Sequence, residues 1–299
     1  MKRILIVIFA GALLFSCAEK TIKKEEVMSK ALKLYQKGEY DDAKEYFKKA
    51  IYKAENMTTT DIMKARYYLG NIYYMEENYV DAIVEFEEFL SLFPTAPQVP
   101  EILYKLADSY MKISPSPDRD LTYIRKAIEK AEEIIDSYPD SIYVSKAKKI
   151  IEKARKIEAT HIIGIADLYE HLGKHYSAAL YYNLVYDDYP DQIEKDFIEY
   201  KIAYNLANAG KQYEEEIDQY TEKIKKLENK INEEKDIEKK NVLINRKKLL
   251  EEHLNRLKER IQKSKKRAVS ILKHAVENYP DSKHKKDMED LLKKLQKEG

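Results

Sequence analysis

The chain has few of the residues on which most catalytic and redox chemistry depends. Its 299 residues include one cysteine, no tryptophan, seven glycines and eight prolines. A single cysteine cannot form an internal disulfide. Seven scattered glycines do not make a phosphate-binding loop, and the sequence has neither a Gly-x-Ser-x-Gly motif nor a catalytic cysteine motif. These absences argue against an enzyme.

The charge of the chain is balanced, and this argues against nucleic-acid binding. Lysine and arginine number 54 and aspartate and glutamate 53, and the two signs alternate along the sequence. A nucleic-acid-binding protein would need a basic stripe, which is missing. Interleaved charge with little glycine and proline is typical of solvated helix surfaces. We therefore expect an all-α protein without a nucleic-acid partner.

Metal or cofactor binding is poorly supported. His171 and His175 are four residues apart, a spacing that can bind zinc on one helix. However, Gly173 and Lys174 lie at a predicted turn, and no glutamate takes the position of a general base. We predict no metal and no cofactor, and a metal-dependent enzyme remains an alternative from a different class.

The N-terminus has the pattern of an export signal. Lys2 and Arg3 precede an apolar run, Ile4–Phe15, of twelve residues. A membrane-spanning helix needs roughly 20 apolar residues, so this run is too short to span a bilayer and is typical of a signal peptide. An ordinary signal peptide followed by an incidental cysteine is one interpretation of these residues.

The residues at the end of this run favour a second interpretation. The sequence "LFSC", Leu14–Cys17, resembles the lipobox of bacterial lipoproteins. The resemblance implies that the Cys17 thiol receives diacylglycerol and that Cys17 becomes the new N-terminus. Several acyl chains, palmitate among them, anchor far better than one. Ala18 follows where an aspartate would retain the lipoprotein at the inner membrane, so we expect an outer-membrane protein on the periplasmic face.

Internal repeats predict the architecture. The stretches "ALKLYQKGEYDDAKEYFKKAI" and "LGNIYYMEENYVDAIVEFEEFLSLFP" share a small residue, an aromatic residue, a polar turn, and then alanine with an aromatic residue four positions on. This pattern resembles the tetratricopeptide repeat, in which small residues let two antiparallel helices approach closely. The predicted small residues are Ala31, Gly70 and Ala107 in first helices and Ala43 and Ala82 in second helices, with Phe47 and Phe86 one turn later.

The prolines support the repeat pattern. Four alanines each precede a proline by twelve residues. A proline cannot continue a helix, and it also biases the residue before it away from helical geometry, so each marks the end of a second helix. We predict five repeats, the first without its proline; a coincidental set of amphipathic helices is the alternative. The pairs are Ala82 and Pro94, Ala127 and Pro139, Ala178 and Pro190, and Ala268 and Pro280.

Two repeats are expected to carry additions. The prolines of Ser114–Leu121 predict a loop in repeat three. A long helix, Ile142–Leu172, should join repeat three to repeat four.

In repeat five, two heptad-spaced apolar seams run from Tyr213 to Ile231 and from Leu243 to Ile261. Such seams need a partner helix, so we predict a coiled-coil hairpin that reverses near Asn232–Glu238, with one unbroken helix as the alternative.

These observations divide the chain into six predicted segments. The division is a signal peptide (1–16), a lipid tether (17–24), repeats one to three (25–141), the joining helix with repeat four and the first helix of repeat five (142–210), the hairpin (211–266), and the second helix of repeat five with a C-terminal helix (267–299).

A lipobox followed by five such repeats resembles the BamD family of outer-membrane lipoproteins. The resemblance is strongest over Phe93–Asp191, with the stretches "FPTAPQVPEILYKLADSYMKI", "YPDSIY" and "ADLYEHLGKHYSAALYYNLVYDDYPD" in the same order. It implies a non-enzymatic scaffold of the β-barrel assembly machinery. The implied partners are the barrel-inserting protein, other assembly lipoproteins and unfolded outer-membrane proteins. The hairpin departs from the family pattern.

The first helices of the repeats are expected to line a concave face. In this face tyrosine offers both apolar area and a polar tip, and an amide can bond the backbone of an extended peptide. The alternative is that these tyrosines only pack between helices. The predicted peptide-binding residues are Tyr35, Tyr67, Asn71, Tyr74, Tyr104, Asp108 and Met111.

The alternative function of the chain is a repeat scaffold for another envelope process, cell-wall or polysaccharide handling.

Overall fold

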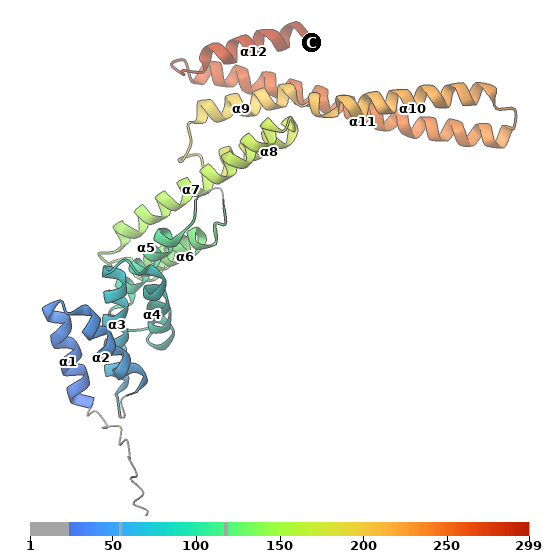
Figure 1. Cartoon of the computed structure of the whole chain (residues 1–299). Coiled ribbons are helices and arrows are strands. Elements are labelled where there is room, and N and C mark those ends of the chain that lie inside the picture. The colour runs from blue at the N-terminus through green and yellow to red at the C-terminus, as the bar shows by residue number, and fades with distance from the viewer. Residues whose placement is uncertain (1–23, 54–55, 117–118, 299) are drawn as a thin grey trace, which may run out of the picture. The chain divides into compact units, whose positions relative to one another are not determined.

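The computed structural model describes residues 24–53, 56–116 and 119–298 of the chain (Figure 1). Within these ranges every regular element is a helix, so the prediction of an all-α, tetratricopeptide-like fold is confirmed. The chain divides into two compact units, Met1–Ser109 and Tyr110–Gly299. Cys17, the signal peptide and nearly all of the predicted tether lie outside the described residues. None of the described helices is both long and apolar enough to cross a membrane.

The first unit consists of helices that pack on their neighbours in chain order. Helix α2 packs against α1 and α3, and α3 packs against α4. The small residues expected at the crossings, Ala31, Ala43 and Ala82, are fully buried. The helices are α1 (Lys24–Lys37), α2 (Tyr40–Tyr52), α3 (Thr59–Met75), α4 (Tyr79–Leu92) and α5 (Val99–Ile113), the last of which continues beyond Ser109 into the second unit.

Gly70 shows why a small residue is needed between α3 and α4. A Cβ atom added at Gly70 would lie 2.6 Å from Cε1 of Phe86, closer than real Cβ contacts come. Phe86 itself is fully buried. The ring therefore fills the space that the missing side chain leaves, as the repeat pattern predicts.

The second unit follows the same principle with longer helices. Helix α7 packs against α6 and α8, α8 packs against α9, and α9 packs against α11, which also contacts α12. Helix α7 occupies the range expected for the long joining helix. The elements are α6 (Thr122–Ser137), α7 (Val144–His171), α8 (His175–Asp188), α9 (Lys195–Asn208), the 3-10 turn η1 (Lys211–Tyr213), α10 (Glu214–Glu233), α11 (Ile237–Asn278) and α12 (Lys285–Glu298).

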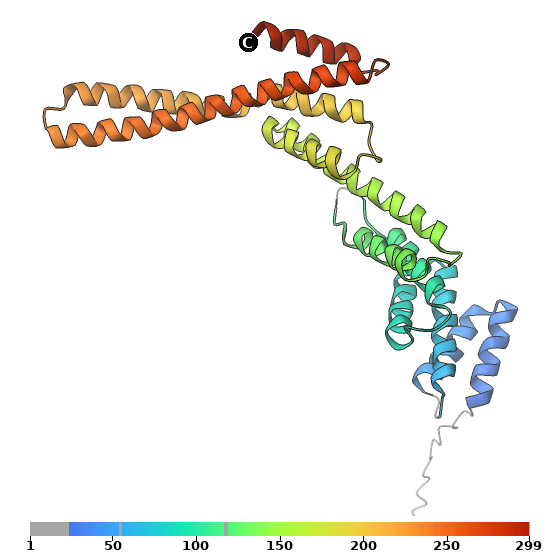
Figure 2. The ribbon, with the colours of Figure 1, turned by 180° about the vertical axis from the view of Figure 1, so that it is seen from behind.

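Helices α10 and α11 pack against each other and run side by side beyond the ends of α8 and α9 (Figures 1 and 2). Residues 234–236 separate them, and the Asp236 side chain caps α11 by accepting a hydrogen bond from the backbone N–H of Lys239. Across the pair, Lys247 lies 2.8 Å from Glu228. Helix α11 continues without a break from the hairpin through residues 266 and 267 into the part that packs on α9.

The ends of four helices share one backbone geometry. The residue that directly follows each of these helices is aromatic, with a φ between −134° and −121° and a ψ between 45° and 64°. A proline follows each of them and disfavours helical geometry in the preceding residue. The prolines therefore impose the same backbone geometry after all four helices. The four residues are Phe93, Tyr138, Tyr189 and Tyr279.

Candidate peptide-binding face

Three side-chain hydrogen bonds join α3 to α5 on one face of the first unit. Each bond connects residues that are 34 positions apart in the sequence. The tetratricopeptide repeat has this same period of about 34 residues. Consecutive first helices therefore lie in register, and polar residues at equivalent positions of neighbouring repeats meet.

Two of these bonds tie tyrosine hydroxyls to carboxylates. Tyr67 donates to Glu101 over 2.9 Å, and Tyr74 donates to Asp108 over 2.7 Å. Burial, together with the bond to Glu101, raises the pKa of Tyr67 to about 12. Burial and the bond to Asp108 also raise the pKa of Tyr74. Both hydroxyls are thus held as neutral hydrogen-bond donors.

The third bond places an ammonium group between the two tyrosines. Nζ of Lys105 donates to Oδ1 of Asn71 over 2.6 Å and also pairs with Glu101. The same Nζ lies 6.0 Å from the ring centre of Tyr67 and 5.7 Å from that of Tyr74. Asn71 is only 4% exposed, so its amide belongs to this network more than to the open surface.

Tyr35 extends the aromatic face onto α1. Its ring centre lies 4.8 Å from that of Tyr68 and 5.7 Å from that of Tyr40. Tyr68 in turn contacts Tyr67 edge to face, with the ring centres 5.3 Å apart. Burial raises the pKa of Tyr35. A continuous set of half-buried tyrosine rings therefore connects α1 with α3.

The remaining predicted residues of this face lie on α5. Tyr104 is half-buried and close enough to Tyr74 to contribute to its raised pKa. Met111 belongs to the second unit, where it packs against Leu121 and Ile124. The structure thus brings most of the predicted residues together in the first unit and places Met111 in a separate apolar cluster.

Sequence reasoning missed Glu101 and Lys105. The expected face was derived from positions around each small residue, and these two residues occupy other positions of α5. The 34-residue offset would have identified them, because it maps Tyr67 onto Glu101 and Asn71 onto Lys105. The result is a face of aromatic rings around a closed polar network.

The structure also accounts for one of the histidines considered as a zinc ligand. Nδ1 of His175 lies 2.9 Å from Oδ1 of Asn205, and His175 is 8% exposed. His175 is therefore part of the packing of α8 on α9. Among the described residues, no three His, Cys, Asp or Glu side chains are grouped so as to hold a metal ion.

Comparisons with known proteins found a matching family and a similar relative. Residues 20–224 match the YfiO family, described as outer membrane lipoprotein. A relative from Aquifex aeolicus (strain VF5), named as an outer membrane protein assembly factor BamD, is 35% identical over 220 residues, which cover 72% of each chain.

Two solved structures align over most of the chain. One is a tetratricopeptide repeat protein from Parabacteroides merdae, with 17% identity, coverage of 91% of this chain and 98% of that chain, and a TM-score of 0.33. The other is the TPR2AB domain of yeast Sti1 in its complex with pHSP90, with 14% identity, the same coverages and a TM-score of 0.37.

The family match spans more than half of the chain, and the Aquifex relative supports it independently. The predicted family and the predicted outer-membrane location are confirmed, and so is the prediction that the protein is not an enzyme. The chain belongs to the YfiO/BamD family of outer-membrane lipoproteins, which are non-enzymatic assembly factors.

Proposed function

We propose that the chain is a lipid-anchored scaffold of the machinery that assembles β-barrel proteins in the outer membrane. In this role it binds the barrel-inserting protein and other assembly lipoproteins, and it holds unfolded outer-membrane proteins. The observation that carries the proposal is the match over residues 20–224, together with a relative named as an assembly factor. The anchor is a lipid on Cys17.

The proposed architecture is five helix pairs with a coiled-coil hairpin inserted in the fifth. The packing supports it, because Ala268 and Leu272, in the part of α11 that follows the hairpin, share a buried cluster with Ala203 of α9. The Leu227, Leu254 and Leu257 side chains are buried where α10 and α11 meet, as a heptad seam requires. The proposed pairs are α1 with α2, α3 with α4, α5 with α6, α7 with α8, and α9 with the second half of α11.

The aromatic face of the first unit is the proposed site for extended substrate segments. Half-buried tyrosine rings supply apolar area, and the hydroxyls of Tyr67 and Tyr74 are bonded to the carboxylates of α5. A peptide would stack on the ring faces while the carboxylates of Glu101 and Asp108 keep the rings in place. The alternative, in which these tyrosines only pack between helices, is tested by the same variants.

The peptide test uses two pairs of substitutions. Tyr67→Ala with Tyr74→Ala should weaken binding of C-terminal peptides of barrel proteins, measured by fluorescence anisotropy. The control pair is Tyr52→Ala with Tyr123→Ala, because these tyrosines are 62% and 38% exposed and lie outside the proposed face. Unchanged binding by the first pair would leave the tyrosines as packing residues only.

The partner is tested by mass spectrometry of proteins that co-purify with the tagged lipoprotein from gently solubilised envelopes. Recovery of the barrel-inserting protein in near-equal amount is the expected result. If a different envelope complex is recovered instead, the assembly role is refuted for this chain. The alternative is then a scaffold for cell-wall or polysaccharide handling.

A further inference from the structure

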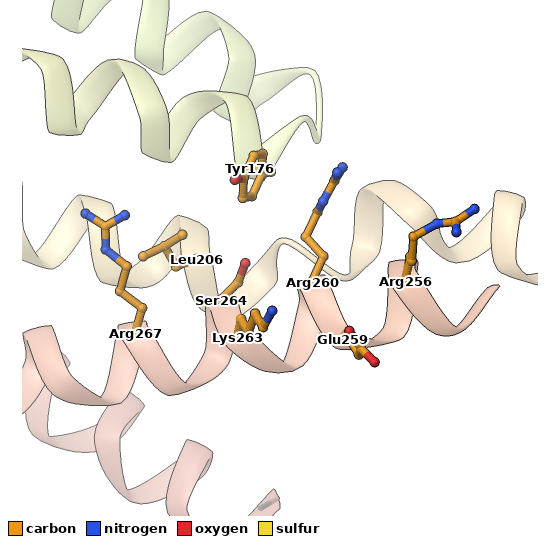
Figure 3. Close-up of a pocket in the computed structure, with 8 residues that line it drawn as sticks. All are labelled: Tyr176, Leu206, Arg256, Glu259, Arg260, Lys263, Ser264 and Arg267. Carbon is orange, nitrogen blue, oxygen red and sulfur yellow. The ribbon is translucent and has the colours of Figure 1, made fainter. Parts of the chain in front are cut away.

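A pocket lies at the base of the hairpin, between the start of α8, the end of α9 and the middle of α11 (Figure 3). Its volume is about 460 Å³, within the range of sites that hold several side chains of a ligand. Its walls combine an aromatic ring, an aliphatic side chain and a hydroxyl with a cluster of charges. The lining residues are Tyr176, Leu206, Arg256, Glu259, Arg260, Lys263, Ser264 and Arg267.

The cations of the pocket lie along one side of α11. Arg256, Arg260, Lys263 and Arg267 follow one another at spacings of four, three and four residues, which place side chains on one face of an α-helix. With a rise of 1.5 Å per residue, the row is about 16 Å long. We call these four residues the cationic row.

The members of the cationic row are not held in ion pairs. Within the part of the chain that the structure describes, no carboxylate lies within ion-pair distance of any of the four. Arg260 is 3.4 Å from the Tyr213 hydroxyl, and Arg267 donates to the Asn183 side chain over 2.7 Å. Each of these neutral partners positions a guanidinium and leaves its other N–H donors available.

Two other lysines of the hairpin are paired with carboxylates. Lys226 pairs with Glu222 over 2.6 Å, and Lys247 pairs with both Glu228 and Glu251. Unlike these two lysines, the four members of the cationic row lie together in one pocket without an ion pair among the described residues. Net charge near zero for the chain makes this concentration more significant.

The orientation of the side chains opens the cationic row to a ligand. Figure 3 shows Arg260 and Arg267 extending from α11 toward the side of Tyr176 and Leu206. Glu259, the acidic residue among those that line the pocket, extends the other way. Its carboxylate does not neutralise the guanidinium groups that face α8.

The shape of the cationic row selects among anions. A single phosphate group is compact and cannot contact a row about 16 Å long. An acidic polypeptide carries carboxylates at intervals of a few ångströms, and each guanidinium can bind a carboxylate with two parallel hydrogen bonds. Three of the four cations are arginines, the residue best suited to that geometry.

Two exposed leucines on α8 also favour a polypeptide. Leu180 and Leu184 follow Tyr176 one and two turns along α8, on the same side of the helix. They are 53% and 42% exposed. A ligand that reaches from the pocket along this side of α8 would therefore meet leucines beyond Tyr176, which suits a segment with both acidic and apolar side chains.

We propose that this pocket is a docking site for an acidic segment of a partner protein, with carboxylates bound to the cationic row and apolar side chains against Tyr176 and the exposed leucines. The site does not depend on the aromatic face of the first unit or on the lipid anchor. It gives the hairpin base a binding role separate from substrate holding.

The test measures binding of a fluorescein-labelled peptide, Glu-Glu-Leu-Glu-Glu-Leu-Glu, to the full lipoprotein in neutral detergent. We expect saturable binding that weakens as salt is added. The same peptide with glutamine in place of glutamate should bind at least about tenfold more weakly. Failure of the acidic peptide to bind would refute the proposal.

Charge reversal then locates the site. Arg256→Glu with Lys263→Glu changes two members of the cationic row that form no intramolecular ion pair or hydrogen bond among the described residues. The control, Lys258→Glu with Lys266→Glu, makes the same charge change at exposed residues of α11 that do not line the pocket. We expect at least about a tenfold loss of affinity for the first pair and less than about threefold for the control.

A reversed peptide and two competitors complete the test. A peptide with lysine in place of glutamate should bind the charge-reversed pocket better than it binds the wild-type protein. Equal losses in the two double variants would show a general charge effect and refute the pocket. Competition by inorganic phosphate, or by vesicles of phosphatidylglycerol, at least as strong as that of unlabelled peptide would assign the pocket to phosphate groups or to a membrane and overturn the proposal.

Discussion

The guanidinium of Arg66 on α3 lies 2.9 Å from the carboxylate of Glu85 on α4, and each side chain is 8% exposed. A second carboxylate, that of the half-exposed Glu88, lies 2.6 Å from the same guanidinium. Burial raises the pKa of Glu85, and the positive charge of Arg66 opposes that rise. The first unit therefore contains a buried carboxylate, that of Glu85, whose negative charge is stabilised by Arg66.

Removal of Arg66 should be costly. Arg66→Met leaves the Glu85 carboxylate buried without its partner, and breaking such a pair typically costs about 3–5 kcal/mol of unfolding free energy. The double variant Arg66→Met with Glu85→Leu should recover most of the loss, because no charge is then buried. Chemical denaturation at pH 7 measures both. An Arg66→Met variant within about 1 kcal/mol of the wild type would show that the pair is dispensable.

The same variant predicts a pH dependence. Without Arg66 the pKa of Glu85 in the folded state rises further above its ordinary value of 4.5. A raised folded-state pKa means that stability is complete below the unfolded-state pKa and is lost as the pH rises through the folded-state value. The stability gap between Arg66→Met and the wild type should therefore widen from pH 4.5 toward pH 7, as measured by denaturation at a series of pH values.

Two glycines on helices should respond oppositely to alanine. Gly70→Ala places a Cβ against the Phe86 ring, and overpacking of this kind costs typically about 1–3 kcal/mol. Gly164 lies exposed within α7 with nothing near its Cβ position, so Gly164→Ala should stabilise by about 0.5–1 kcal/mol. Thermal unfolding of both variants checks the contrast, and a neutral Gly70→Ala would mean that Phe86 moves aside freely.

The turn after α3 carries a strained residue. Glu77 has a φ of +59°, whereas the corresponding turns use Gly38 and Gly173 at +77° and +69°. A non-glycine residue in this left-handed region costs about 1–2 kcal/mol. Glycine avoids that strain, but it loses more conformational entropy on folding, which offsets part of the gain. Glu77→Gly should therefore stabilise by up to about 1 kcal/mol. The opposite substitution, Gly38→Ala, serves as the control and should lower the free energy of unfolding, as measured by chemical denaturation. A Glu77→Gly variant that is less stable than the wild type would contradict the argument.

The tyrosine network predicts a loss of stability in alkali. Since the pKa of folded Tyr67 is about 12 against an ordinary 10, the folded state holds this proton more tightly than the unfolded state. The stabilisation is complete below pH 10 and disappears as the pH rises toward 12. Tyr67→Phe should reduce the fall in unfolding free energy between pH 10 and pH 11.5. An unchanged slope would show that the Glu101 bond does not control this proton.

Much of the helical framework could be predicted from local sequence features. The small residues Ala31, Gly70 and Ala82 mark close helix crossings, and the structure buries all of them. The prolines mark helix ends because proline restricts the residue before it, whatever surrounds the helix. These features act within a few residues, so no knowledge of the tertiary arrangement is needed to recognise them.

The candidate site was only partly predictable, because contacts across repeats decide which side chains remain free. Tyr67 and Tyr74 were expected as open hydrogen-bonding tips, and the structure pairs each with a carboxylate of α5. Lys105 was not expected at all, yet it links Asn71 to Glu101. A position count within one repeat does not contain this information.

The sequence by itself thus determined the helical class of the protein, the small residues at its close crossings and the prolines at its helix ends, since each depends on short-range sterics and on a repeated pattern. Only the tertiary structure decided how polar residues pair across the face and that the cationic row of α11 meets Tyr176 and Leu206 in one pocket. The reason is physical. Hydrogen bonds and charge clusters depend on side chains from helices distant in sequence, and their convergence is defined only when those helices pack.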